Sequence, residues 1–96
     1  MKIFTNLKSD YVPYHNTYTS AVNGALQFAK NNGYDVDDEE VSELVGLQSQ
    51  RPKPGKTTRV TIPLYKNGKL QRKALHFQVY NRETEIDPYE LNMYIS

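Results

Sequence analysis

Glycine, lysine and threonine, which bind phosphate in nucleotide-binding loops, occur together at residues 54–58. The sequence Pro-Gly-Lys-Thr-Thr there resembles the end of such a loop. That loop needs a glycine five residues before Gly55, where this chain has Gln50, and it needs a helix after the threonine. The residues that follow alternate in a strand-like pattern, so the helix dipole and amide groups that hold phosphate would be missing. The sequence therefore does not support a nucleotide site.

Carboxylates and imidazoles, which bind metals, do not have ligand spacing here. Acidic residues gather at Asp35, Asp37, Asp38, Glu39, Glu40 and Glu43. Glu40 stands where a calcium loop needs its turn glycine, and Glu43 falls short of the bidentate position, so the N-terminal turn of a helix explains the cluster better. With two histidines, His15 and His76, and no cysteine, no metal site is expected.

Catalysis needs a nucleophile or an acid/base pair held by partners, and no serine, histidine and carboxylate stand at a spacing that suggests one. We therefore expect a non-enzymatic protein without a cofactor. A chain of 96 residues with 38% hydrophobic residues fits one domain with a modest core, and the absence of cysteine fits a reducing compartment. Without a signal-like or membrane-spanning apolar run, we expect no membrane partner.

The first half of the chain predicts an arm followed by two helices. Residues 1–16 match neither helical nor strand periodicity and are expected to form an extended arm. Residues 17–47 are the helical part, with N-cap candidates at Thr17, Thr19 and Ser20 and at Asp35 and Asp37. Gly24 inside the first helix costs about 1 kcal/mol against alanine, so we expect a close contact with another backbone to offset it.

The second half predicts a β-meander. Residues 48–56 form a Pro/Gly-rich linker, expected to be extended and solvated. Three runs within residues 57–96 then alternate with period two, and each places three apolar side chains on one face. They are Val60, Ile62 and Leu64; Leu75, Phe77 and Val79; and Leu91, Met93 and Ile95. Asn67-Gly68 predicts a type I′ hairpin between the first two runs, and Pro63 predicts that the first is an edge strand.

The expected fold is a single α+β domain, with two helices packed on one face of a three-stranded antiparallel β-meander and an extended N-terminal arm. The opposite sheet face is then polar and aromatic. We predict that it is an interaction surface formed by Tyr65, His76, Tyr80 and Tyr94. The charged rim of that surface is predicted to comprise Lys53, Lys56, Lys66, Lys69, Arg72 and Lys73.

Two functions fit such a surface. Tyrosines suit protein interfaces because the ring buries area while the hydroxyl tolerates water, so the preferred hypothesis is a protein partner or self-assembly. The alternative is a single-stranded nucleic-acid-binding module, in which the tyrosine face stacks bases and the basic hairpin neutralises phosphates. Against that alternative, acidic Glu90 lies on the proposed platform, and tyrosine, threonine and glutamine are common on solvated sheet faces.

Several short motifs in the C-terminal half resemble small uncharacterised proteins of large contractile-tailed bacteriophages. They are residues 51–57 (Arg-Pro-Lys-Pro-Gly-Lys-Thr), 66–69 (Lys-Asn-Gly-Lys), 78–81 (Gln-Val-Tyr-Asn) and 89–96 (Tyr-Glu-Leu-Asn-Met-Tyr-Ile-Ser). The resemblance implies a viral protein located in the virion or in the cytoplasm of the bacterial host. It implies a virion structural or assembly component or a host-interaction factor, and no catalytic residue.

Overall fold

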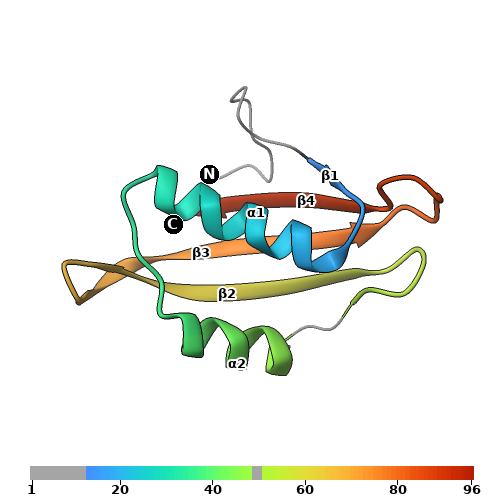
Figure 1. Cartoon of the computed structure of the whole chain (residues 1–96). Coiled ribbons are helices and arrows are strands. Elements are labelled where there is room, and N and C mark those ends of the chain that lie inside the picture. Colours follow the sequence, from blue (N-terminus) through green and yellow to red (C-terminus); the bar gives the residue numbers. More distant parts are fainter. Residues whose placement is uncertain (1–12, 49–50) are drawn as a thin grey trace.

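A computed structural model describes residues 13–48 and 51–96, in which two helices accompany a four-stranded antiparallel sheet (Figure 1). The elements are β1 (Tyr14–His15), α1 (Tyr18–Asn31), α2 (Asp38–Gln48), β2 (Thr57–Lys66), β3 (Lys69–Asn81) and β4 (Tyr89–Ile95). The strand order is β1-β4-β3-β2. The α+β class is thus confirmed, and the sheet has one strand more than the meander that the sequence predicts.

Helix boundaries follow the capping residues. The Thr17 side chain accepts a hydrogen bond from the Ser20 N–H (3.0 Å), and Asn32 and the left-handed Gly33 (φ +88°) follow the last turn of α1. Asp37 caps α2 by accepting from the Glu40 N–H at 3.0 Å. Local hydrogen bonding therefore fixes both helix starts as the sequence indicates.

The hairpin between β2 and β3 forms as predicted. Both central residues have positive φ, 52° at Asn67 and 78° at Gly68, as a type I′ turn requires. The predicted edge position of Pro63 is also confirmed, since β2 is the last strand of the sheet and β3 lies between β2 and β4.

The fourth strand comes from the predicted arm. Tyr14 pairs with Glu90 and His15 with Tyr89, and the Leu91 N–H donates to the Pro13 carbonyl at 2.7 Å. A strand of two residues has no alternation to detect, so only its pairing with distant β4 defines it. The rest of the predicted arm, residues 1–12, lies outside the described residues.

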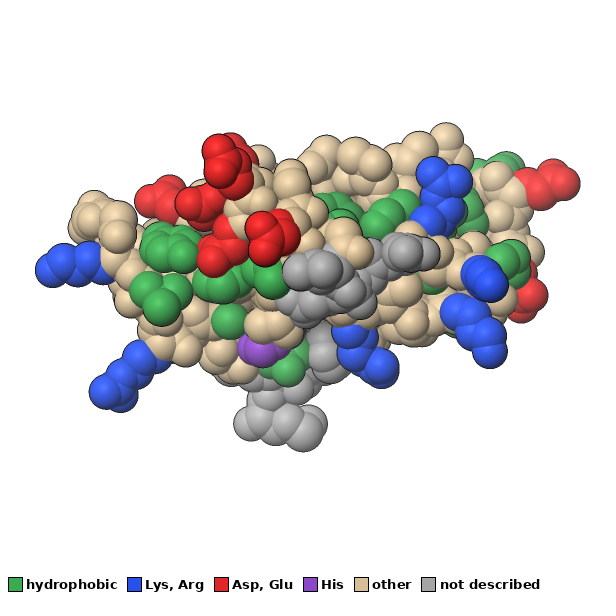
Figure 2. Space-filling view, turned by 90° about the horizontal axis from the view of Figure 1, so that it is seen from below, with side chains coloured by type: hydrophobic (Ala, Val, Ile, Leu, Met, Phe, Trp, Pro, Cys, Tyr) green, Lys and Arg blue, Asp and Glu red, His purple; other side chains and the backbone are tan. Residues whose placement is uncertain are grey.

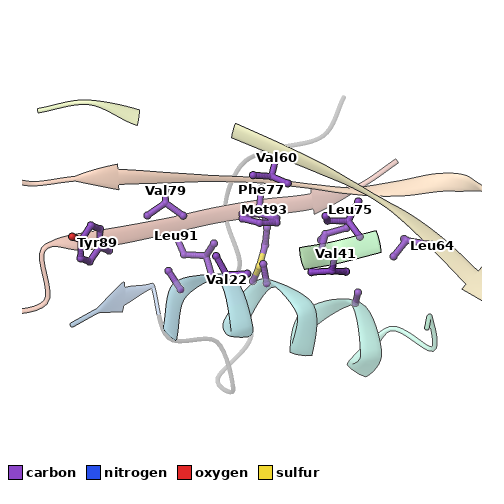
Figure 3. Close-up of a cluster of buried hydrophobic side chains, with 14 residues drawn as sticks. Val22, Val41, Val60, Leu64, Leu75, Phe77, Val79, Tyr89, Leu91 and Met93 are labelled. Carbon is purple, nitrogen blue, oxygen red and sulfur yellow. The ribbon is translucent and has the colours of Figure 1, made fainter. Parts of the chain in front are cut away.

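The core lies between α1 and one face of the sheet (Figure 3). Eight of the nine predicted inward residues are buried, and Ile95 packs partly buried against them. From α1 come Ala21, Val22, Ala25 and Ala29. Val41 joins from α2, which lies beside the edge strand β2 (Figures 1 and 3). Burial of each large apolar side chain contributes about 1.5–3 kcal/mol.

The sequence predicts that the linker is extended and solvated, and the prediction of a solvated linker is wrong for residues 52–56. This part of the linker is hydrogen-bonded to the end of the sheet. Pro52 is buried, and its carbonyl accepts from the Asn81 side-chain amide at 3.1 Å. The Gly55 N–H donates to the Asn81 carbonyl at 2.9 Å, and the Asn81 N–H donates to the Lys56 carbonyl at 3.0 Å. Proline prevents regular structure here, but these hydrogen bonds hold the loop against the end of β3.

Candidate interaction surface

The sheet face opposite the core carries side chains in cross-strand rows. In the first row Thr61 lies opposite His76, and His76 lies opposite Tyr94. The His76 and Tyr94 rings stack, with centroids 4.8 Å apart and planes 21° from parallel. Thr61 Oγ1 lies 3.2 Å from His76 Nδ1, so the imidazole is held from both neighbouring strands.

Two further rows follow along β3. Gln78 lies between Arg59 and Asn92, and Arg59 Nε donates to Gln78 Oε1 at 3.1 Å. Tyr80 lies between Thr57 and Glu90, and Glu90 also pairs with Tyr14 of β1. We call the surface formed by these rows the tyrosine face. Its members are Tyr14, Thr57, Arg59, Thr61, His76, Gln78, Tyr80, Glu90, Asn92 and Tyr94.

Three of the four predicted aromatic residues thus share one face, and their rings are half-buried: His76, Tyr80 and Tyr94. The signal that finds them is simple, because residues two apart on one strand and residues directly opposite on the next strand point to the same side.

Tyr65 does not join the other three. It lies past a register shift in the β2–β3 pairing, and its hydroxyl donates to Glu40 Oε1 of α2 at 3.0 Å. This hydrogen bond raises the pKa of Tyr65, and burial and the negative charges of Glu40 and Asp37 raise it further. Tyr65 therefore holds α2 against the β2 edge, which alternation alone could not indicate.

The predicted basic rim is divided between the two ends of the sheet. Lys53 and Lys56 precede the start of β2, whereas Lys66 and Lys69 flank the turn at its other end. A ten-residue strand spans about 30 Å, at roughly 3.3 Å per residue. Arg72 and Lys73 lie near the same turn as Lys66 and Lys69, so four of the six cations form one group. Figure 2 shows basic side chains projecting at both ends of the molecule.

Sequence reasoning missed Tyr14 and Arg82. The Arg82 guanidinium carbon lies 4.1 Å from the centroid of the Tyr14 ring, a cation–π contact. Arg82 is fixed in turn by donating to the Asp87 carbonyl at 2.9 Å. Tyr14 belongs to the segment without periodicity, so no local pattern could have placed it on this face.

His15, the neighbour of Tyr14, points to the other side and positions β1. It is 9% exposed, and its Nδ1 lies 2.8 Å from Ser20 Oγ in the first turn of α1. The ring also lies close to Gly24. The close contact that the sequence predicts at Gly24 exists, but side chains of His15 and Leu91 make it instead of a backbone.

The described residues include no group of three or more histidine, cysteine, aspartate or glutamate side chains that could hold a metal ion. Neither described helix is long and apolar enough to cross a membrane. No protein-family model matches the chain, and no match was found among curated proteins or solved structures. Function is therefore inferred from the geometry of the tyrosine face and of the basic groups.

Proposed function

We propose that the chain is a non-catalytic binding module that contacts a protein partner, a second copy of itself being the first to consider, through the tyrosine face. The observation that carries this proposal is the stacked pair of His76 and Tyr94, with Tyr80 four residues along β3 from His76 on the same face. Aromatic side chains supply large contact area, and they are enriched among the residues that dominate binding energy.

The central side chains of the tyrosine face are already fixed within the monomer. The His76 ring is fixed by its stack with Tyr94 and its contact with Thr61, and Gln78 is fixed by Arg59. Ordering a mobile side chain at an interface costs about 0.5–1.5 kcal/mol, and much of that cost is already met here within the folded monomer. A partner would meet a surface whose central side chains need little rearrangement.

The charge of the surface also favours protein over single-stranded nucleic acid. Arg59 and Glu90 are the charged members of the tyrosine face, and Glu90 lies directly opposite Tyr80. A phosphate backbone running along the face would pass this carboxylate, and the lysines that could offset it lie at the two ends of β2. A mixed polar and aromatic face is typical of protein interfaces.

The phage resemblance supports a role in the virion or in the cytoplasm of the infected bacterium. Within that setting the module acts as a structural or assembly component, or as a factor that binds a host protein. It brings no catalytic group to the complex and acts by holding its partner in place.

Light scattering of the full chain over a range of protein concentrations, at low and moderate salt, tests the self-assembly form of the proposal. We expect a mass above that of the monomer that rises with concentration and changes little with salt. Tyr80→Ser should return the protein to a monomer. The matched control is Ile86→Ser, because Ile86 is 75% exposed in the turn after β3 and lies outside the tyrosine face.

A monomer at every concentration would refute self-assembly. A photo-crosslinking amino acid at Gln78 then tests a different protein partner in infected cells, with the same group at Thr84 as control. Crosslinks specific to position 78 and lost with Tyr80→Ser support the proposal, and their absence refutes it. A gain of mass on adding a mixed single-stranded oligonucleotide, lost with Tyr80→Ser, would establish the nucleic-acid alternative instead.

A further inference from the structure

The end of the β2–β3 hairpin projects beyond the rest of the sheet (Figure 1). The last register pair between β3 and β4 joins Leu75 and Ile95, and the Ala74 and Ser96 backbones exchange hydrogen bonds of 3.0 and 3.2 Å. Beyond these residues β2 is the one described strand with which β3 pairs. We call residues 65–73 the hairpin arm.

The base of the arm is anchored. Asp35, in the connection between the helices, exchanges backbone hydrogen bonds of 2.8 and 2.9 Å with Tyr65. The Lys66 ammonium lies 4.5 Å from the centroid of the Tyr34 ring. With the Tyr65–Glu40 hydrogen bond, these contacts fix the direction in which the arm leaves the domain.

The pairing between β2 and β3 is irregular at the position of two cations of the arm, Arg72 and Lys73. Tyr65 pairs with Leu70 and Pro63 with Ala74, so residues 71–73 lie opposite the single residue Leu64. Such a bulge breaks the alternation of side chains. Arg72 and Lys73 are consecutive and are both exposed.

The arm is strongly positive and carries one exposed leucine. The chain has no carboxylate from residue 57 to residue 81. Lys69, Arg72 and Lys73 are exposed, and none of them makes an ion pair with a residue that the structure describes. Leu70, between them, is 66% exposed. Three cations and a leucine thus project together on a two-stranded ribbon.

We propose that the hairpin arm binds double-stranded nucleic acid by entering a groove and pairing Lys69, Arg72 and Lys73 with backbone phosphates. A two-stranded β-ribbon fits the major groove of B-form DNA, which is about 12 Å wide. Cations on such a ribbon reach the phosphates that border the groove, while Leu70 meets the base edges. A flexible single strand offers no groove to match this shape.

The position of α2 limits the contact to the arm. Asp38, Glu39 and Glu43 of α2 are exposed, and α2 packs against β2. Figure 2 shows acidic side chains gathered in one patch of the surface. They repel phosphate, so the duplex approaches the arm from its tip and not along the edge of the sheet. Binding is therefore electrostatic, weakly dependent on sequence, and independent of the tyrosine face.

Fluorescence anisotropy of a labelled 16-base-pair duplex of mixed sequence, titrated with the full chain at 50–200 mM KCl, tests the proposal. Neutralising three phosphates predicts a slope of about −2.7 for the logarithm of the binding constant against that of salt concentration, or a roughly 40-fold loss of affinity over this range. Each of Lys69→Gln, Arg72→Gln and Lys73→Gln should reduce the magnitude of the slope by about 0.9. The triple variant should not bind.

Two control variants distinguish binding through the arm from a general effect of positive charge and from an effect of the tyrosine face. Lys53→Gln removes one positive charge at the opposite end of β2 and should leave the slope unchanged. Tyr80→Ser, on the tyrosine face, should also leave it unchanged when both proteins are compared at concentrations at which the wild-type chain is monomeric. Leu70→Ser should weaken binding without changing the slope. Circular dichroism confirms that each variant is folded.

Several results would overturn the proposal. The first is a triple variant that binds the duplex with the affinity and the salt slope of the wild-type chain. The second is tighter binding of the full chain to either isolated strand than to the duplex. The third is binding of the full chain to vesicles containing anionic lipid that is as tight as its binding to the duplex. A salt-sensitive self-association that the triple variant abolishes, without duplex binding, would assign the arm to the acidic α2 surface of a second copy.

Discussion

Replacing Gly24 by alanine tests how β1 is held against α1. A Cβ atom at this position would lie 3.2 Å from His15 Cε1, 3.2 Å from Leu91 Cδ2 and 3.3 Å from His15 Nε2. These separations are shorter than an ordinary van der Waals contact between carbon atoms, which is about 3.5–4.0 Å. The neighbours must move by a few tenths of an ångström to admit the methyl group.

Two opposing effects determine how much Gly24→Ala changes the free energy of unfolding: the higher helix propensity of alanine and the cost of overpacking. Alanine gains about 1 kcal/mol over glycine in a helix interior, whereas overpacking a close-packed site costs about 1–3 kcal/mol. Leu91 is fully buried, and His15 is 9% exposed and held by Ser20 at 2.8 Å, so neither moves freely. We expect Gly24→Ala to lower the free energy of unfolding by about 1 kcal/mol, or the melting temperature by about 4–8 °C.

Gly46→Ala is the matched control, because Gly46 also lies in a helix and a Cβ there would meet nothing within 4 Å. Alanine has the higher helix propensity, and no neighbouring atom is close enough to clash with its methyl group. The free energy of unfolding should therefore rise by up to about 1 kcal/mol. Urea denaturation followed by circular dichroism measures both changes. A second test is Gly24→Ala in a His15→Ala background, where the neighbouring ring is gone and the loss should shrink. Equal stabilisation by both glycine substitutions would refute the packing argument.

Three other perturbations test the loop, the turn and the α2 contact. Asn81→Ala should cost about 1–3 kcal/mol in urea denaturation, because the buried Pro52 carbonyl and a backbone N–H of the following turn lose their partner; an unchanged midpoint would contradict this role. Gly68→Ala should cost about 1 kcal/mol, because φ is 78° there, and a gain in stability would show that the turn adopts another type. For Tyr65 the pKa in the folded state exceeds the unfolded value near 10, so its contribution is complete below that pH and is lost as the pH rises through the folded pKa. Tyr65→Phe should therefore reduce the alkaline loss of stability in titrations from pH 9 to 12, and an identical alkaline profile would exclude the hydrogen bond to Glu40 as its cause.

The tyrosine face shows how far a sequence predicts a site. His76, Tyr80 and Tyr94 are found from alternation along two strands, because strand periodicity holds wherever the pairing is regular. Tyr65 has the same alternation, but it lies past the irregularity in β3 and beside α2. Tyr14 and Arg82 meet only because β1 pairs with β4 at the far end of the chain.

The basic residues give a similar lesson. In the sequence they form one stretch from residue 51 to residue 73, which suggests a continuous rim. Because β2 is an extended strand, it carries the two parts of this stretch to opposite ends of the sheet. The charge excess is a property of the sequence, but its division into two groups follows from the hairpin.

The sequence by itself determined the features that depend on neighbouring residues: the caps at Thr17 and Asp37, the turn at Asn67-Gly68, and the alternation that separates core from surface. Each rests on hydrogen bonds or backbone sterics within a few residues. Only the tertiary structure decided the β1–β4 pairing, the position of α2 beside β2 and the contact of His15 with Gly24. These depend on which surfaces meet when the chain closes on itself, and the free energy of such contacts comes from packing between residues that no local pattern connects.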